Sequence, residues 1–189
     1  RAPARHLHSL NIRCGLHARE TEWEIPGGRL TVRSERFASM DNPHMVYLRC
    51  TLRSTCPVSA ELSTGIDTAV WDINGPHFTR VRCMSQDGRL TAEGITGEKG
   101  TVVQVCDEVH TNFGGEAVVL EDDGKILRVY RLQLEPEKDY ILEKAAMIQT
   151  SGDDGYPLEG TFEGYEEALA KHTARWEKIW NMSQVDIDG

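Results

Sequence analysis

Residues 44–53, HMVYLRCTLR, decide the fold class of this chain. Apolar side chains occupy every second position of the segment, at Val46, Leu48, Cys50 and Leu52. Successive side chains of a β-strand point to opposite faces, so this period of two predicts a strand with one buried face. A half-buried strand needs neighbours on both sides, and the flanking sequence supplies them.

Turn sequences on either side divide the chain into further strands. Pro-Gly-Gly at 26–28 favours a turn, because proline presets φ and glycine accepts positive φ. Asp-Gly pairs at 87–88 and 123–124 indicate two β-hairpins. Residues 1–9 are interpreted as a loose lead-in and residues 10–13 as a short strand. With about ten strand candidates, we predict an all-β fold, an antiparallel two-sheet β-sandwich, because each sheet must bury one face.

The last predicted strand, residues 139–150, is apolar on both sides. Ile141, Ala145 and Met147 share one face. The other face carries Leu142, Ala146 and Ile148. This pattern predicts a strand whose two faces are both covered.

The hydrophobic period changes after residue 160. Five side chains fall at steps of four, three, four and four, which is one stripe of an α-helix: Tyr165, Leu169, His172, Trp176 and Trp180. We therefore expect a β-sandwich domain over residues 1–150, a polar linker over 151–160 and a linker helix over 161–189.

Four members of this stripe, Tyr165, Leu169, Trp176 and Trp180, are candidate interface residues. Each is too apolar to remain in water, since full burial of such a side chain is worth roughly 1.5–3 kcal/mol. Two partners stay open at this point. The stripe packs either on the domain's own sheet or on a further domain that follows the helix.

Charge and composition argue against several classes of function. A formal net charge of −9 argues against a nucleic-acid partner, and the chain has no apolar run long enough to cross a bilayer. Its five cysteines form no C-x-x-C motif, which favours free thiols and a reducing, cytoplasmic compartment. The N-terminus has no apolar stretch typical of a signal peptide. No metal-ligand spacing and no cofactor motif is recognised, so we expect neither a metal nor a cofactor.

Residues 63–78, STGIDTAVWDINGPHF, hold the densest set of groups suited to binding. The candidate substrate-binding residues are Trp71, Asp72, Asn74 and His77. A sugar has apolar C–H faces and a rim of hydroxyl groups, so an aromatic ring beside carboxylate and amide groups suits it. The alternative is a polar loop between two strands, with Trp71 folded into the core.

Three segments together resemble the N-terminal region of family 65 glycoside hydrolases. They are GLHARETEWEIPGGRLTVRSERFASMDNPHMVYLRCTL (15–52), ELSTGIDTAVWDINGPHF (61–78) and YEEALAKHTARWEKIW (165–180). That family contains disaccharide phosphorylases, such as those of maltose, trehalose and kojibiose, and related hydrolases. The resemblance covers nearly the whole chain in the right order. It implies a large sandwich followed by a linker helix, with strands of the family's domain missing from this chain at the N-terminal side.

The resemblance also implies that the catalytic residues lie in another part of the polypeptide. The family's general-acid Glu and phosphate-binding residues lie in a helical barrel that follows the linker helix, so no residue of this chain inherits a catalytic role. The implied partners are that barrel in the same polypeptide, an α-linked gluco-disaccharide and a second copy in a homodimer. Three functions remain open: a non-catalytic domain that shapes the active-site entrance and aids assembly, a free-standing carbohydrate-binding sandwich, or a structural or dimerisation domain. Whether the chain alone is an enzyme stays open, although activity is not expected.

Overall fold

The computed structural model describes residues 2–69, 71–73, 75–122, 124–157 and 162–183. Within these residues, eight strands form a large sheet in the order β1-β2-β3-β4-β13-β10-β9-β8 and three form a small sheet in the order β11-β12-β5. The large sheet comprises β1 (Arg5–Asn11), β2 (Leu16–Ile25), β3 (Gly28–Ala38), β4 (Met45–Ser54), β13 (Asp139–Thr150), β10 (Val102–Thr111), β9 (Arg89–Thr96) and β8 (Phe78–Gln86). The small sheet comprises β11 (Val118–Asp122), β12 (Lys125–Leu134) and β5 (Val58–Asp67). A two-stranded hairpin, β6 (Trp71–Asp72) and β7 (Gly75–Pro76), and helix α1 (Tyr165–Ser183) complete the fold.

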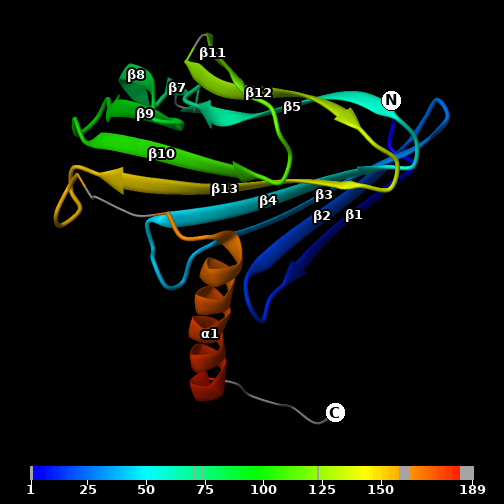
Figure 1. Ribbon diagram of the computed structural model, residues 1–189. Coiled ribbons are helices and arrows are strands. Elements are labelled where there is room, and N and C mark those ends of the chain that lie inside the picture. Colours follow the sequence, from blue (N-terminus) through cyan, green and yellow to red (C-terminus); the bar gives the residue numbers. More distant parts are fainter. Residues whose placement is uncertain (1, 70, 74, 123, 158–161, 184–189) are drawn as a thin grey trace.

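The elements form three layers. Figure 1 shows the small sheet lying over one face of the large sheet, with α1 on the opposite side. All paired strands in both sheets run antiparallel. The predicted two-sheet β-sandwich followed by one C-terminal helix is therefore confirmed.

The core between the two sheets is built from the inward faces of both. One cluster fills the space where β12 faces β4 and β13, and its buried members are Leu52, Tyr130, Leu132, Leu134, Tyr140 and Leu142. A second cluster lies at the other end of the small sheet and contains Ile66, Leu90, Ala92 and Ile126. A third lies under α1 and includes Phe37, Tyr47, Met147, Tyr165 and Ala168. The small sheet and the helix thus cover different faces of the large sheet.

Strand β13 changes its buried face along its length. Leu142 packs in the core between the sheets, whereas Met147 packs under α1. Both faces of β13 are covered in this way, as its sequence predicts. Ile148 is nevertheless 41% exposed, so this cover does not reach every apolar side chain of the strand.

The interpretation of residues 1–9 as a loose lead-in is wrong. They contribute most of β1, which pairs with β2 from Arg5↔Glu22 to Asn11↔Leu16. Every side chain of β1 is exposed, so the strand has no buried face and leaves no period of two in the sequence. Backbone hydrogen bonds to β2 define it instead.

The expected boundaries of the C-terminal part can be compared only in part. The helix begins at Tyr165, and the Gly164 carbonyl accepts its first hydrogen bond, from the Ala168 amide at 3.0 Å. Glu166 and Glu167 lie in the first turn, where the helix dipole favours negative charge. Residues 158–161 and 184–189, which belong to the expected linker and helix, lie outside the described residues.

An ion-paired cluster crosses the interior between the sheets. Asp107 of β10 is fully buried and pairs through Oδ1 with Arg128 of β12, while Lys144 Nζ of β13 lies 2.8 Å from its Oδ2. The same two cations also donate to backbone carbonyls: Arg128 to Gly88 at 2.6 Å and Lys144 to Gly65 at 2.6 Å. The cluster thereby links both sheets and the β8–β9 turn.

Candidate functional site

The Trp71 loop, residues 69–77, connects the small sheet to the edge of the large one. Its hairpin pairs Trp71 with Pro76 and Asp72 with Gly75, and Gly75 has φ of 102°, which a glycine adopts readily. The Trp71 side chain is 72% exposed and Ile73 is fully exposed. The Trp71 ring is thus not part of the core, and it is accessible as a binding role requires.

The other predicted members of this site are placed less completely. His77 lies exposed beside the hairpin, and its carbonyl accepts a 3.0 Å hydrogen bond from the Gly97 amide. The side chain of Asp72 and the whole of Asn74 lie outside the described residues. The structure therefore brings Trp71 and His77 into one exposed loop, and their substrate-binding role stays a prediction.

Ordered contacts hold the base of the Trp71 loop. The Thr68 amide donates to the Gly124 carbonyl at 2.9 Å, and Asp67 pairs with Lys125 at 2.9 Å. Asp67 also accepts a 3.0 Å hydrogen bond from the Ala69 amide. Both contacts lower the pKa of Asp67, and the contact with Lys125 has the larger effect. Asp67 therefore acts as an ionised anchor and is poorly suited to be a general acid.

The cavity below the loop is too small to enclose a disaccharide. It has a volume of about 160 Å³ and an almost wholly apolar lining that includes Ile66, Phe78 and Val105. Sites that enclose a ligand of drug-like size usually have roughly 300–1,000 Å³. A sugar at this end of the molecule would therefore lie against the exposed loop, with another surface needed to close the site.

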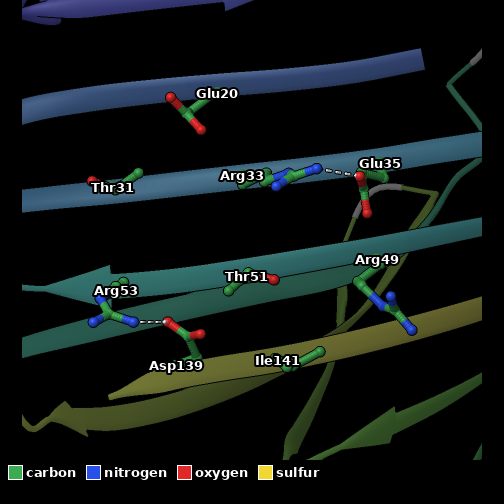
Figure 2. Close-up of a pocket in the computed structure, with 9 residues that line it drawn as sticks. All are labelled: Glu20, Thr31, Arg33, Glu35, Arg49, Thr51, Arg53, Asp139 and Ile141. Atoms are coloured by element: carbon green, nitrogen blue, oxygen red, sulfur yellow. Dashed lines mark hydrogen bonds and ion pairs between the residues drawn. The ribbon is translucent and has the colours of Figure 1, made fainter. Parts of the chain in front are cut away.

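A second depression, of about 470 Å³, lies on the face of the large sheet that also carries α1. Figure 2 shows its lining side chains on four adjacent strands, β2, β3, β4 and β13: Glu20, Thr31, Arg33, Glu35, Arg49, Thr51, Arg53, Asp139 and Ile141. Each of its arginines pairs with a carboxylate, Arg33 with Glu35, Arg49 with Glu143 and Arg53 with Asp139. Paired charges of this kind make a polar surface suited to contact with another polar surface.

The remaining polar groups provide no assembled catalytic centre within the described residues. Glu108 is engaged by Arg89 at 2.9 Å and by His110 at 2.8 Å, so these side chains form an ion-paired surface cluster beside Cys106. No group of three or more His, Cys, Asp or Glu residues among those described could hold a metal ion. The described part of the chain also contains no helix long and apolar enough to cross a membrane.

The helical stripe contacts this domain's own strands and turns. Tyr165 is 2% exposed, packs edge-on against Phe37 and lies under the Arg49 guanidinium, 4.0 Å from the ring centroid. Leu169 is partly buried against the same cluster. Trp176 and Trp180 are half-buried against the turn between β1 and β2, where Trp180 donates to the Arg13 carbonyl at 2.6 Å. All four residues thus contact their own domain, and their role as interface residues stays a prediction.

The hydrogen bonds of His172 were not predicted from the sequence. His172 is the stripe member with a fully buried side chain between two loops, 1% exposed and hydrogen-bonded through both ring nitrogens. The position of His172 in the apolar stripe could have indicated them, because a histidine that is buried on an apolar helical face needs hydrogen-bond partners for its ring nitrogens.

Fold and site together define a class: a two-sheet β-sandwich domain with an exposed loop and a closing helix. The chain belongs to the family described as "Glycosyl hydrolase family 65, N-terminal domain", whose sequence profile matches residues 3–179.

Named relatives agree with this assignment. The chain is 28% identical to nigerose phosphorylase of Lachnoclostridium phytofermentans, with 99% of this chain and 29% of the relative aligned. It is 30% identical to 1,2-alpha-glucosylglycerol phosphorylase of Bacillus selenitireducens, over 95% of this chain and 24% of the relative. Among solved structures, one assigned as a kojibiose phosphorylase from the human microbiome superposes with a TM-score of 0.80 over 93% of this chain and 25% of that one, at 13% identity. The chain thus spans about a quarter of the length of these relatives.

Proposed function

We propose that this chain is the non-catalytic N-terminal domain of a phosphorylase that acts on α-linked glucosides, most simply a gluco-disaccharide. The observation that carries the proposal is the match of residues 3–179 to the family's N-terminal domain. In agreement with it, the alignments to the two named phosphorylases cover 99% and 95% of this chain but only 29% and 24% of those relatives. Glycoside cleavage usually employs a pair of carboxylates, whereas Asp67, Asp107 and Glu108 of this chain are each ion-paired with a cation. Catalysis would then belong to a helical barrel in the same polypeptide.

Two surfaces support contact with such a barrel. The outer side of α1 exposes polar residues such as Glu167 and Lys178, and the depression beside the helix is lined by paired charges. Figure 1 shows α1 on the side of the large sheet opposite the small sheet. The strands that line the depression pack against the helix on the same face. The proposal includes a homodimer of the full polypeptide and a cytoplasmic location, which the five free cysteines favour.

The Trp71 loop has a separate role in this proposal. Its exposed ring and exposed Ile73 project from the sandwich, while Thr68 and Asp67 fix its base. A rigidly anchored loop with an accessible aromatic ring can contribute one wall of a sugar site whose other walls come from another domain. The loop would thus shape the entrance to the active site.

The isolated 189-residue chain is expected to show no turnover. Purified chain is incubated with maltose, kojibiose and nigerose, with and without inorganic phosphate, and released glucose and glucose phosphate are measured. Turnover that co-purifies with the chain through successive columns would contradict the proposal. Calorimetry with the same sugars distinguishes this proposal from a free-standing carbohydrate-binding sandwich. Saturable binding of a sugar to the isolated chain would favour the latter.

In the full-length polypeptide, Trp71→Ala is expected to raise KM for the disaccharide about 2- to 10-fold, because an aromatic contact contributes roughly 0.5–1.5 kcal/mol. The free energy of unfolding should change by less than about 0.5 kcal/mol, since the side chain is exposed. Val119→Ala, which removes an exposed apolar side chain from β11, is the control and should leave both quantities unchanged. If Trp71→Ala left the kinetics unchanged or caused a large loss of stability, the loop would have a structural role and not a substrate-binding one.

A further inference from the structure

Three side chains of α1 contact the turn between β1 and β2, residues 12–15. His172 bonds to the Cys14 carbonyl, and Trp180 bonds to the Arg13 carbonyl at 2.6 Å. Between them, the Trp176 indole lies so close to Gly15 that a Cβ placed there would be 3.1 Å from Nε1. Gly15 also has φ of 61°, so both its conformation and the approach of the ring favour glycine.

His172 joins this turn to a second one. Its Nδ1 lies 3.0 Å from the Met40 amide in the turn between β3 and β4, while Nε2 faces the Cys14 carbonyl. The ring also packs 4.6 Å from Phe37 and 6.4 Å from Trp176, measured between ring centroids. One imidazole therefore connects α1 with the loops at the ends of four strands.

These contacts fix the protonation state of the ring. A backbone amide can only donate, so Nδ1 must accept from Met40; a carbonyl can only accept, so Nε2 must carry the proton that is donated to Cys14. The ring is therefore the neutral Nε2–H tautomer. A second proton would sit on Nδ1, opposite the Met40 amide hydrogen, and would break that bond.

We propose that His172 is a pH-sensitive latch that holds the C-terminal part of α1 against the 12–15 turn only while its imidazole is neutral. The N-terminal part of the helix has independent anchors, because Tyr165 and Ala168 belong to the buried cluster with Phe37. Protonation should consequently free residues 172–183 and the 12–15 turn while residues 165–168 stay docked. The site of release is local, and it does not depend on the function proposed above.

The charged groups around the latch do not offset a positive ring. From the β3–β4 turn, Asp41 is already paired with Arg175 of α1 at 2.8 Å. On the helix itself, Lys171 is paired with Glu163 and Glu167. From the β1–β2 turn, Arg13 and Cys14 present backbone carbonyls, and β3 presents the Phe37 ring. The contacts described for the ring include no carboxylate that would stabilise its charge.

The direction of the pH effect follows from burial. Burial lowers the pKa of His172, and the hydrogen bond to Cys14 opposes this only in part. A released histidine has a pKa of about 6.5 and binds a proton more readily than the latched one. The latch is therefore complete above pH 6.5 and weakens as pH falls below that value. At pH 5.5 the equilibrium constant for release should be up to about tenfold larger than at pH 7.5.

Hydrogen exchange and NMR on the 189-residue chain test this. Between pH 7.5 and 5.5, protection factors of the 12–15 turn, the Met40 amide and residues 172–183 should fall by up to about tenfold, while those of β4 stay unchanged. The ¹⁵N shifts of His172 should show an Nε2–H tautomer at pH 7.5 and a pKa below 6.5. Wild-type measurements alone can overturn the proposal, through a pKa at or above 6.5 or through uniform loss of protection across β4 and α1.

A non-titrating variant completes the test. The glutamine of His172→Gln has an acceptor oxygen and a donor NH2 group, and it does not titrate. In this variant the protection of α1 amides from hydrogen exchange should therefore not vary with pH over this range. His110→Gln, which removes an exposed histidine on β10, is the matched control and should keep the wild-type pH response. A His172→Gln chain that folds and retains the full pH response would overturn the latch.

Discussion

Asp107→Asn is expected to lower the free energy of unfolding by about 3–5 kcal/mol, the usual cost of breaking a buried ion pair from one side. Asp107 is fully buried, and its partners Arg128 and Lys144 are largely buried too. The substitution keeps the size of the side chain but leaves two cations between the sheets without their anion. Urea denaturation at pH 7 measures the change.

The control is an exposed ion pair on the small sheet. Glu61 and Arg131 lie 3.9 Å apart with both side chains mostly exposed, so Glu61→Gln should cost no more than about 0.5 kcal/mol. A loss below about 1 kcal/mol for Asp107→Asn would contradict the prediction. It would mean that the sheets are held together by apolar packing and that the ion-paired cluster contributes little.

Tyr165→Ala is expected to lower the free energy of unfolding by about 3–5 kcal/mol, as large-to-small aromatic substitutions in a core usually do. The side chain is 2% exposed, packs against Phe37 and carries the Arg49 guanidinium over its ring. Its loss would leave a cavity where α1 begins, so the helix should also lose protection from hydrogen exchange. Thermal and urea unfolding followed by circular dichroism measure both effects.

Two companion variants separate packing from polarity. The Tyr165 hydroxyl is buried without a hydrogen-bond partner among the described residues, and burial raises its pKa. Tyr165→Phe keeps the ring and removes the unpaired hydroxyl, so it should be neutral or slightly stabilising. Met182→Ala, on the exposed end of α1, should change stability by less than about 0.5 kcal/mol. If Tyr165→Ala were equally harmless, the helix would belong to a partner domain and not to this core.

Local patterns in the sequence were sufficient to predict the class of fold. The alternation at 44–53 marked β4, turn residues marked the hairpins, and the change of period after residue 160 marked α1. These signals are local, because each depends on side chains a few positions apart on one strand or helix. The resemblance to family 65 also depended on sequence order alone, and the match over residues 3–179 confirms it.

The candidate site was predictable only as a set of residue types. The sequence placed an aromatic ring beside polar groups at 63–78, but it left open whether Trp71 would be exposed or packed in the core. In the structure the Trp71 side chain is 72% exposed, and the buried cluster around Ile66 does not include it. Burial depends on which surfaces the rest of the chain leaves uncovered, and no local pattern records that.

The pairing of β1, the choice of which face each end of β13 buries, and the contacts of α1 depend on the tertiary structure. β1 has no buried face, so only its backbone bonds to β2 reveal it. β13 buries opposite faces at its two ends because the small sheet and the helix cover different parts of the large sheet. His172 meets Met40 across 132 positions and Cys14 across 158. Such contacts arise when distant elements pack together, and periodicity within any one element cannot specify them.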